Sequence, residues 1–178
     1  NQLIQVSEKI NTEGFEDIVK DTLLTVSQVS DIQNLNGLRG MNRYIISNSD
    51  AVKDVMNVYA FFKICGYKDE DINMDIVPLF ETMEGLADAE EVMRNLYNFP
   101  VYQKHLAKRN NVQTIMLGFS DGTKDGGYLM ANWSIFKAKV GLSEVAAKHK
   151  VKLAFFDGRG GPPSRGGGKT HRFYASMG

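Results

Sequence analysis

The spacing of apolar residues changes along this chain. Over residues 1–36, apolar side chains recur at helical intervals with no strand-like run, which predicts one or two helices. Beyond residue 40, short apolar runs alternate with longer stretches of helical spacing. The short runs predict four β-strands, at residues 43–47, 75–80, 113–119 and 151–156. The longer stretches predict helices, at residues 52–65, 86–96, 101–108 and 129–149.

This alternation of strands and helices predicts an α/β fold. Strands that are apolar at nearly every residue are typical of parallel sheets buried on both faces. Two architectures fit the pattern, an open doubly wound sheet and part of a (β/α)8 barrel. We place a helical segment at residues 1–40 and the α/β unit at residues 41–178. In both architectures, functional side chains gather at the carboxyl ends of the strands.

Charged residues follow the predicted second and third strands where each one ends. Glu81 follows the second strand, and Asp121 follows the third, with Lys124 close behind. Two carboxylates at neighbouring strand ends can share a hard divalent cation, which takes its other ligands from substrate and water. Each acid could instead cap a helix or form a surface ion pair. Residues 122–127 are expected to form a loop, in which Lys124 either helps to bind an anion or is simply solvated.

A Gly-rich stretch follows the predicted fourth strand. Residues 158–168 comprise six glycines, two prolines, one serine and two arginines, Arg159 and Arg165. Few side chains shield the backbone N–H groups, including those of Gly160 and Gly161, and the guanidinium groups add bidentate donors. The stretch therefore predicts a binding site for a phosphate or carboxylate anion.

Two other interpretations of the Gly-rich stretch stay open. Such stretches are often flexible linkers, and Arg-Gly-Gly runs also occur in RNA-binding segments. The strand before it, and Thr170 after it as a possible helix cap, favour a phosphate cradle between a strand and a helix. Its glycine spacing matches neither the P-loop nor the dinucleotide-binding fingerprint.

Composition narrows the class of protein. The length of 178 residues predicts a single domain, and 21 basic residues balance 21 acidic ones, so no overall charge attracts nucleic acid or a membrane. The single cysteine, Cys65, is expected in the core and not as a nucleophile, which is typical of a cytoplasmic setting. His105 and His149 are expected at exposed helix positions, and together with His171 they lack the spacing of a metal site or a catalytic triad.

Three blocks of sequence carry a specific likeness to one enzyme family. They are residues 77–82 (VPLFET), 118–127 (GFSDGTKDGG) and 156–171 (FDGRGGPPSRGGGKTH). In these blocks and their spacing, the chain resembles phosphoenolpyruvate carboxylase. Residues 44–50 and Trp133 add to the likeness, which extends from about residue 41 to the end of the chain.

The resemblance implies about half of a (β/α)8 barrel with additional helices. It also implies a cytoplasmic carbon–carbon lyase that joins bicarbonate to phosphoenolpyruvate, giving oxaloacetate and phosphate with Mg²⁺ or Mn²⁺. By motif position, Glu81 and Asp121 would hold the metal ion. Arg159 would bind the substrate phosphate and Arg165 the bicarbonate, with Lys124 nearby. The family further implies an inhibitory C4 acid at Arg165 and a homotetrameric parent, and gives no reason to expect nucleic acid or a membrane as a partner.

The chain also departs from the family pattern. Asp157 stands where most members have histidine and adds a negative charge beside Arg159, residues 162–164 replace small or aliphatic residues, and Lys169 replaces a proline. The family's catalytic histidine, from an N-terminal motif, is absent from this sequence. We therefore expect a segment of a longer enzyme that is inactive alone and that self-associates through its open edges. The alternative is a stand-alone phosphate- or RNA-binding module without catalysis.

Overall fold

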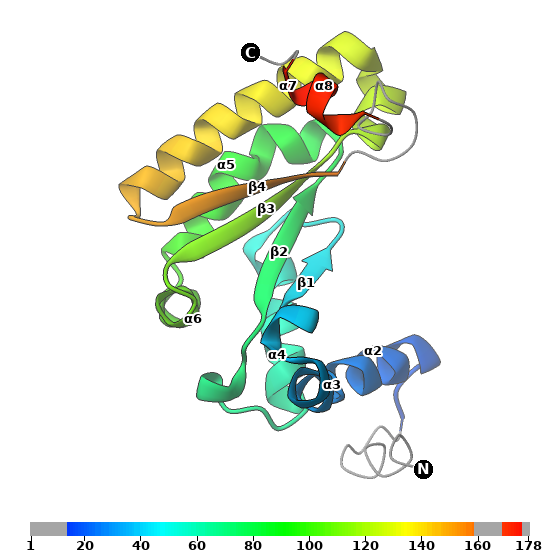
Figure 1. Ribbon diagram of the computed structural model, residues 1–178, viewed down its shortest axis with the longest axis vertical. Coiled ribbons are helices and arrows are strands. Elements are labelled where there is room, and N and C mark those ends of the chain that lie inside the picture. Colours follow the sequence, from blue (N-terminus) through cyan, green and yellow to red (C-terminus); the bar gives the residue numbers. More distant parts are fainter. Residues whose placement is uncertain (1–13, 159–168, 176–178) are drawn as a thin grey trace.

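The computed structural model describes residues 14–158 and 169–175, and the fold is that of those residues (Figure 1). The helices are α2 (Asp17–Ser27), α3 (Val29–Asn36), α4 (Val52–Ile64), α5 (Met83–Tyr97), α6 (Pro100–Lys108), α7 (Ser120–Lys148) and α8 (Thr170–Ala175). The strands are β1 (Arg43–Ile46), β2 (Asp75–Phe80), β3 (Val112–Gly118) and β4 (Lys152–Gly158). Short 3₁₀ turns span Leu38–Gly40 and Asp69–Asp71. None of these described helices has both the length and the hydropathy needed to cross a bilayer.

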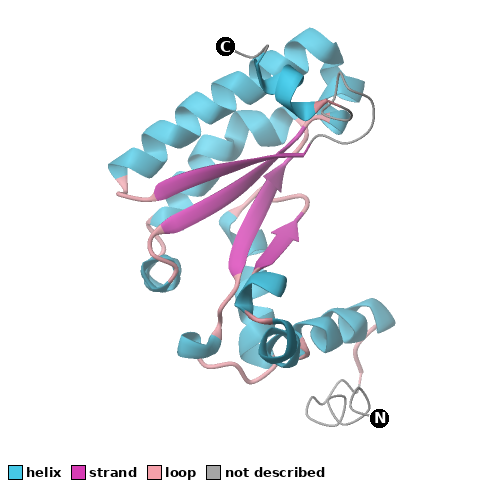
Figure 2. Cartoon of the chain, in the orientation of Figure 1, coloured by secondary structure: helices cyan, strands magenta, loops and turns pink. Residues whose placement is uncertain are grey.

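The four described strands form one parallel sheet in the order β1-β2-β3-β4 (Figure 2). The last residue of β1 pairs with Pro78 of β2. Phe80 then pairs with Leu117 of β3, and Gly118 pairs with Gly158 of β4. The predicted α/β class with parallel strands is confirmed. The strands follow one another in chain order without a reversal.

One face of the sheet is covered by α4, α5 and α7, of which α5 and α7 lie side by side (Figure 2). Four strand residues on this face are at most 1% exposed: Ile76, Phe80, Ile115 and Leu117. Apolar helix residues complete the core: Val55, Phe62, Leu86, Met93, Ile135 and Leu142. Because successive strand residues point to opposite faces, the other face carries a different set of side chains. It includes Ile45 and Phe156, which are 42% and 45% exposed, so part of this face is open to solvent.

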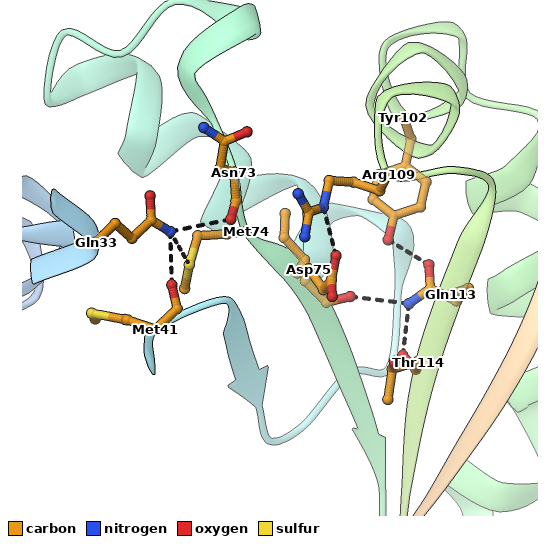
Figure 3. Close-up of polar contacts among 10 residues, drawn as sticks. Gln33, Met41, Asn73, Met74, Asp75, Tyr102, Arg109, Gln113 and Thr114 are labelled. Atoms are coloured by element: carbon orange, nitrogen blue, oxygen red, sulfur yellow. Dashed lines mark hydrogen bonds and ion pairs between the residues drawn. The ribbon is translucent and has the colours of Figure 1, made fainter. Parts of the chain in front are cut away.

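The helical prediction for the start of the chain is confirmed over the described residues by α2 and α3. These helices contribute Val26 and Val29 to the core. Gln33 of α3 joins them to the sheet, because its Nε2 donates to Met41 O at 2.7 Å and to Asn73 O at 3.2 Å (Figure 3). The two carbonyls lie just before β1 and β2. Residues 14–36 are thus anchored at the amino end of the sheet.

A second polar network lies at the amino ends of β2 and β3. The buried Tyr102 hydroxyl donates to Gln113 Oε1 at 2.6 Å, and Gln113 Nε2 donates to Ile76 O at 3.0 Å (Figure 3). Beside it, Arg109 Nε donates to Asp75 Oδ1 at 2.7 Å. These contacts tie α6 to both strands at the end of the sheet opposite the predicted site.

Two predicted boundaries beside the predicted site are wrong. Residues 122–127, expected as a loop, belong to α7, which begins at Ser120 and is interrupted only at Gly127, where φ is 78° and ψ is 168°. In its first turn, Thr123 Oγ1 donates to the carbonyl oxygen of Phe119, the residue just before the helix, at 2.7 Å. The strand β4 continues to Gly158, two residues further than predicted. In both places Gly and Asp residues suggested a loop, but pairing with neighbouring elements keeps the backbone regular.

Candidate metal and anion site

Three strand ends lie side by side at the carboxyl edge of the sheet. Gly118, the last residue of β3, pairs with Gly158, the last residue of β4. On its other side Gly118 meets Glu81, because a Cβ on Gly118 would overlap the Glu81 side chain and lie 3.1 Å from the Glu81 Cα. A Cβ on Gly158 would lie 3.1 Å from Leu117 O. The two glycines therefore allow the strand ends to approach at backbone distance.

Glu81 is half-buried and lines a cavity of about 420 Å³. The cavity lies between the loop after β1 and the start of α5, and its lining also includes Asn48, Asp50, Glu84 and Asp88. Carboxylate and amide oxygens are the ligands that hard divalent cations prefer in proteins. The donor chemistry around Glu81 therefore fits Mg²⁺ or Mn²⁺.

Thr82 starts the helix that follows Glu81. The Thr82 Oγ1 accepts a hydrogen bond from the Gly85 N–H at 2.9 Å and is the N-cap of α5. Thr82 therefore fills the helix-capping role considered for Glu81.

Asp121 and Lys124 lie on the first turns of α7, directly after β3. Asp121 is the second residue of α7, three positions after Gly118. Its side chain lies outside what the structure describes, so its approach to Glu81 stays a prediction. Lys124 is exposed, and it lies on a helix and not in the expected loop. The N-terminus of α7 adds partial positive charge at this edge of the sheet.

The Gly-rich stretch joins a strand to a helix, as predicted. Its first residue, Gly158, is the last residue of β4, and α8 begins at Thr170. The residues expected to bind anions lie outside the described residues: Arg159, Gly160, Gly161 and Arg165. The described structure therefore fixes where this stretch starts, beside the end of β3 and one strand away from Glu81.

Comparison with known proteins decides the family. A family model described as phosphoenolpyruvate carboxylase matches residues 5–176. The chain belongs to the phosphoenolpyruvate carboxylase family.

Three relatives named phosphoenolpyruvate carboxylase illustrate the similarity. The protein from Nitrosomonas europaea is 37% identical over 162 residues, covering 89% of this chain and 17% of the relative. The Corynebacterium diphtheriae protein is 41% identical over 135 residues, 76% of this chain and 14% of the relative. The Xanthomonas euvesicatoria pv. vesicatoria protein is 42% identical over 146 residues, 81% of this chain and 16% of the relative. The chain thus spans less than a fifth of the length of these phosphoenolpyruvate carboxylases.

Asp157, which departs from the histidine expected at this position, is paired with a lysine of the helix layer. Its Oδ1 lies 2.9 Å from the Nζ of Lys139, which comes from α7. The side chain of Asp157 is 10% exposed and that of Lys139 is 26% exposed. The expected negative charge beside Arg159 is therefore balanced at short range by an ammonium group.

The prediction that His105 is exposed is wrong. Its side chain is buried between the rings of Tyr59 and Tyr102, with ring centroids 5.6 and 5.7 Å away. Burial, together with the Arg109 guanidinium, lowers the pKa of His105 from 6.5 to about 4. The imidazole is therefore neutral at pH 7, and it lies at the amino end of the sheet, away from Glu81.

His149 and the cysteine also lie outside the site, whereas His171 lies at the start of α8, just after the Gly-rich stretch. His149 is half-buried at the end of α7, with its Nδ1 2.9 Å from Val145 O, and His171 is exposed. Cys65 is half-buried, and burial raises the pKa of its thiol to about 11, which agrees with a packing role. Among the described side chains, which exclude that of Asp121, no three His, Cys, Asp or Glu residues are arranged to hold a metal ion.

Sequence reasoning missed four residues that shape this site. Gly118 and Gly158 end apolar strand runs, a signal that identifies sites of close backbone approach. Thr82 precedes a helical pattern and could have been recognised as its cap. Nothing in the sequence pairs Lys139 with Asp157, because the two residues come from elements whose relative placement only the fold defines.

Proposed function

We propose that this chain is the metal- and anion-binding segment of a phosphoenolpyruvate carboxylase. The observation that supports this most directly is the position of Gly118, which contacts Glu81 on one side and pairs with Gly158 on the other. The expected metal ligand after β2, the start of the helix that carries the second expected ligand, and the start of the Arg-containing stretch therefore meet at one edge of the sheet.

The roles of the site residues follow from this arrangement and from family membership. Glu81 and Asp121 would hold Mg²⁺ or Mn²⁺, with Lys124 close by. Arg159 would orient the phosphate of phosphoenolpyruvate, and Arg165 would bind bicarbonate, so that a bicarbonate oxygen faces the phosphorus. Attack there would transfer the phosphoryl group to bicarbonate, giving carboxyphosphate and the enolate of pyruvate. The carboxyl group would then pass from carboxyphosphate to the enolate carbon, giving oxaloacetate and phosphate. When bound, the metal ion would supply positive charge to the phosphate and the enolate oxygen.

The architecture of the parent is part of the same proposal. Four parallel strands in chain order, with helices on one face and an apolar opposite face, suit about half of a (β/α)8 barrel. In this proposal residues 41–178 contribute the barrel strands and residues 1–40 precede them. The parent would be a cytoplasmic homotetramer, with Arg165 also able to bind an inhibitory C4 acid.

The isolated segment is proposed to be inactive. His105 and His149 lie toward the amino ends of the strands, away from Glu81, and the catalytic histidine expected in the family would lie elsewhere in the parent. A turnover assay that detected oxaloacetate from the purified chain would contradict this part of the proposal.

Calorimetric titration of Mn²⁺, with and without phosphoenolpyruvate, tests the binding roles. The native chain should bind Mn²⁺, more tightly when phosphoenolpyruvate is present. Glu81→Gln and Asp121→Ala should each weaken Mn²⁺ binding by about tenfold or more. Glu91→Gln is the matched control, because Glu91 is an exposed glutamate on α5 that does not line the cavity.

Two outcomes would overturn the proposal. Equal Mn²⁺ affinity in native, Glu81→Gln and Asp121→Ala chains would remove both acids from the metal site. Metal-independent binding to single-stranded RNA that weakens steeply with salt would favour the stand-alone module instead.

A further inference from the structure

The loop between β1 and α4 turns back onto the strand that it leaves. Asn48 adopts a left-handed backbone conformation, with φ of 51°, which asparagine tolerates better than most residues. The next residue, Ser49, lies beside Ile46, the last residue of β1, and is only 1% exposed. A buried hydroxyl needs hydrogen-bond partners within the protein, because burial removes the water that would otherwise solvate it.

The Ser49 hydroxyl finds its partners where the pairing of β1 with β2 ends. Its Oγ donates to Ile46 O at 3.1 Å and accepts from the Leu79 N–H at 3.3 Å. Ile46 pairs with Pro78 at the end of the β1–β2 register. Because proline has no N–H, Leu79 supplies the next backbone donor along β2 after Val77. One side chain therefore joins the ends of two strands.

The strand end that Ser49 holds leads directly to Glu81. Leu79 lies two residues before Glu81, and both line the same cavity as Ser49. On the other side of β2, Leu79 pairs with Met116 of β3, and Gly118 packs closely against Glu81. The end of β2 is thus held from two directions, by β3 and by Ser49. A shift of this strand end would move the Glu81 carboxylate.

Ser49 also fixes a second wall of the cavity. Its neighbours Asn48 and Asp50 both line the cavity. The far end of the loop is held separately, since the Ala51 N–H donates to Asp54 Oδ2 of α4 at 2.9 Å. With both ends anchored, the loop keeps its distance from Glu81 without a ligand in the cavity.

We propose that Ser49 is a positioning residue for Glu81: its hydroxyl joins the ends of β1 and β2 and thereby sets where the Glu81 carboxylate lies in the cavity. Ser49 acts through the backbone of β2 and through its own loop, and does not itself touch the metal ion. The inference rests on the proposed function, because Glu81 is the proposed metal ligand.

Two substitutions at Ser49 and two controls test this role. Ser49→Ala removes the hydroxyl, and Ser49→Thr keeps it. Ser47→Ala is the matched control, because Ser47 is an exposed serine of the same loop that does not line the cavity. Tyr102→Phe controls for lost stability, since it breaks a buried hydrogen bond at the opposite end of the sheet.

Three measurements on the purified chain separate the steps. They are the amide exchange rate of Leu79, the chemical shift of the Glu81 carboxyl carbon in the metal-free chain, and the Kd of Mn²⁺. Ser49→Ala should speed Leu79 exchange by about tenfold, because the N–H loses a protecting partner. It should also change the Glu81 chemical shift and weaken Mn²⁺ binding by about fivefold or more, because metal ligands tolerate little displacement.

The other three variants should behave differently from Ser49→Ala. Ser49→Thr should recover most of the native Glu81 chemical shift and Mn²⁺ affinity, because it retains the hydroxyl. Ser47→Ala should match the native chain in all three measurements. Tyr102→Phe should lose stability but keep the native Glu81 chemical shift and Mn²⁺ affinity.

A native Glu81 chemical shift in Ser49→Ala would overturn the inference. So would an equal change in Tyr102→Phe, which is the signature of a general loss of stability. If the native chain binds no Mn²⁺, the proposed metal-binding function fails, while Leu79 exchange and the Glu81 chemical shift still decide the role of Ser49.

Discussion

Gly118 packs so closely against Glu81 that no side chain fits between them. A Cβ on Gly118 would overlap the Glu81 Cβ and lie 3.1 Å from the Glu81 Cα. The neighbour here is backbone and the stem of a side chain, neither of which can rotate away. The position of the Glu81 carboxylate therefore depends on the absence of a side chain on the adjacent strand.

Gly118→Ala is expected to displace Glu81 and to separate the ends of β2 and β3. The overlap should lower the free energy of unfolding by about 1–3 kcal/mol, as overpacking does elsewhere. It should also weaken Mn²⁺ binding by about tenfold or more, because metal ligands tolerate little displacement. Chemical denaturation and calorimetry measure the two effects.

Gly141→Ala is the control for that substitution. The three nearest atoms to a Cβ at Gly141 all belong to the Glu90 side chain, the closest being a carboxylate oxygen at 2.7 Å. This carboxylate can rotate away, and Ala is favoured over Gly within a helix by up to about 1 kcal/mol. Equal losses of stability in Gly118→Ala and Gly141→Ala would contradict the special role of the Gly118 contact.

Tyr102 and Tyr97 form a matched pair for testing the polar network at the amino end of the sheet. Both side chains are buried, but the Tyr102 hydroxyl donates to Gln113 Oε1 at 2.6 Å. The Tyr97 hydroxyl has no hydrogen-bond partner among the described residues. Tyr102→Phe should cost about 1–2 kcal/mol in the free energy of unfolding, because it leaves a buried acceptor unpaired. Tyr97→Phe should be neutral or stabilising, and a larger loss for Tyr97→Phe would refute this account.

His105 should make the free energy of unfolding decrease as the pH falls from about 6.5 to about 4. Its pKa is about 4 in the folded chain, against 6.5 for an ordinary histidine, so the unfolded chain binds this proton first as pH falls. The full contribution is present above about pH 6.5 and is lost between there and about pH 4, by up to roughly 3 kcal/mol.

His105→Phe keeps an aromatic ring between Tyr59 and Tyr102 but cannot titrate. Urea denaturation of both proteins at several pH values isolates the histidine, because the carboxylates titrate in both. The native chain should lose more stability than His105→Phe between pH 6.5 and 4. Parallel pH profiles would show that His105 is accessible to protons in the folded state.

The partly open face of the sheet is expected to drive self-association of the isolated chain. Ile45 is 42% exposed on β1, which is an edge strand of the described sheet. Ile45→Lys should shift sedimentation velocity profiles toward the monomer. Ile18→Lys serves as the comparison, because Ile18 is 72% exposed on α2. A native chain that sediments as a monomer at all concentrations would contradict this expectation.

The strand pattern was predictable because buried parallel strands have a strong local signature. The runs at residues 75–80 and 113–119 are almost continuously apolar, and the first coincides with β2 as observed. The strand ends also placed Glu81 correctly, since the residue after a parallel strand must lie at the carboxyl edge of the sheet. Local sequence was sufficient to predict a residue's position wherever that position depended on one helix or strand alone.

The errors occurred where two elements determine the environment of a residue together. The polar side chain of His105 suggested exposure, but its burial depends on how α6 packs between Tyr59 and the amino end of β2. Asp157 was expected only to add a negative charge beside Arg159, and its partner Lys139 was missed because Lys139 lies 18 positions earlier in the sequence and meets it only across the helix layer. Such contacts leave no periodic signal in a single sequence.

The interruption at Gly127 divides α7 into two parts that can be modified independently. The short part carries Asp121 and Lys124, while the long part carries Ile135 and Leu142 into the core. Because the backbone leaves helical geometry between them, a change in residues 120–126 need not rotate the long helix about its axis. Residues 120–126, which carry the proposed metal ligand Asp121, can therefore be substituted without changing how the long part of α7 packs in the core.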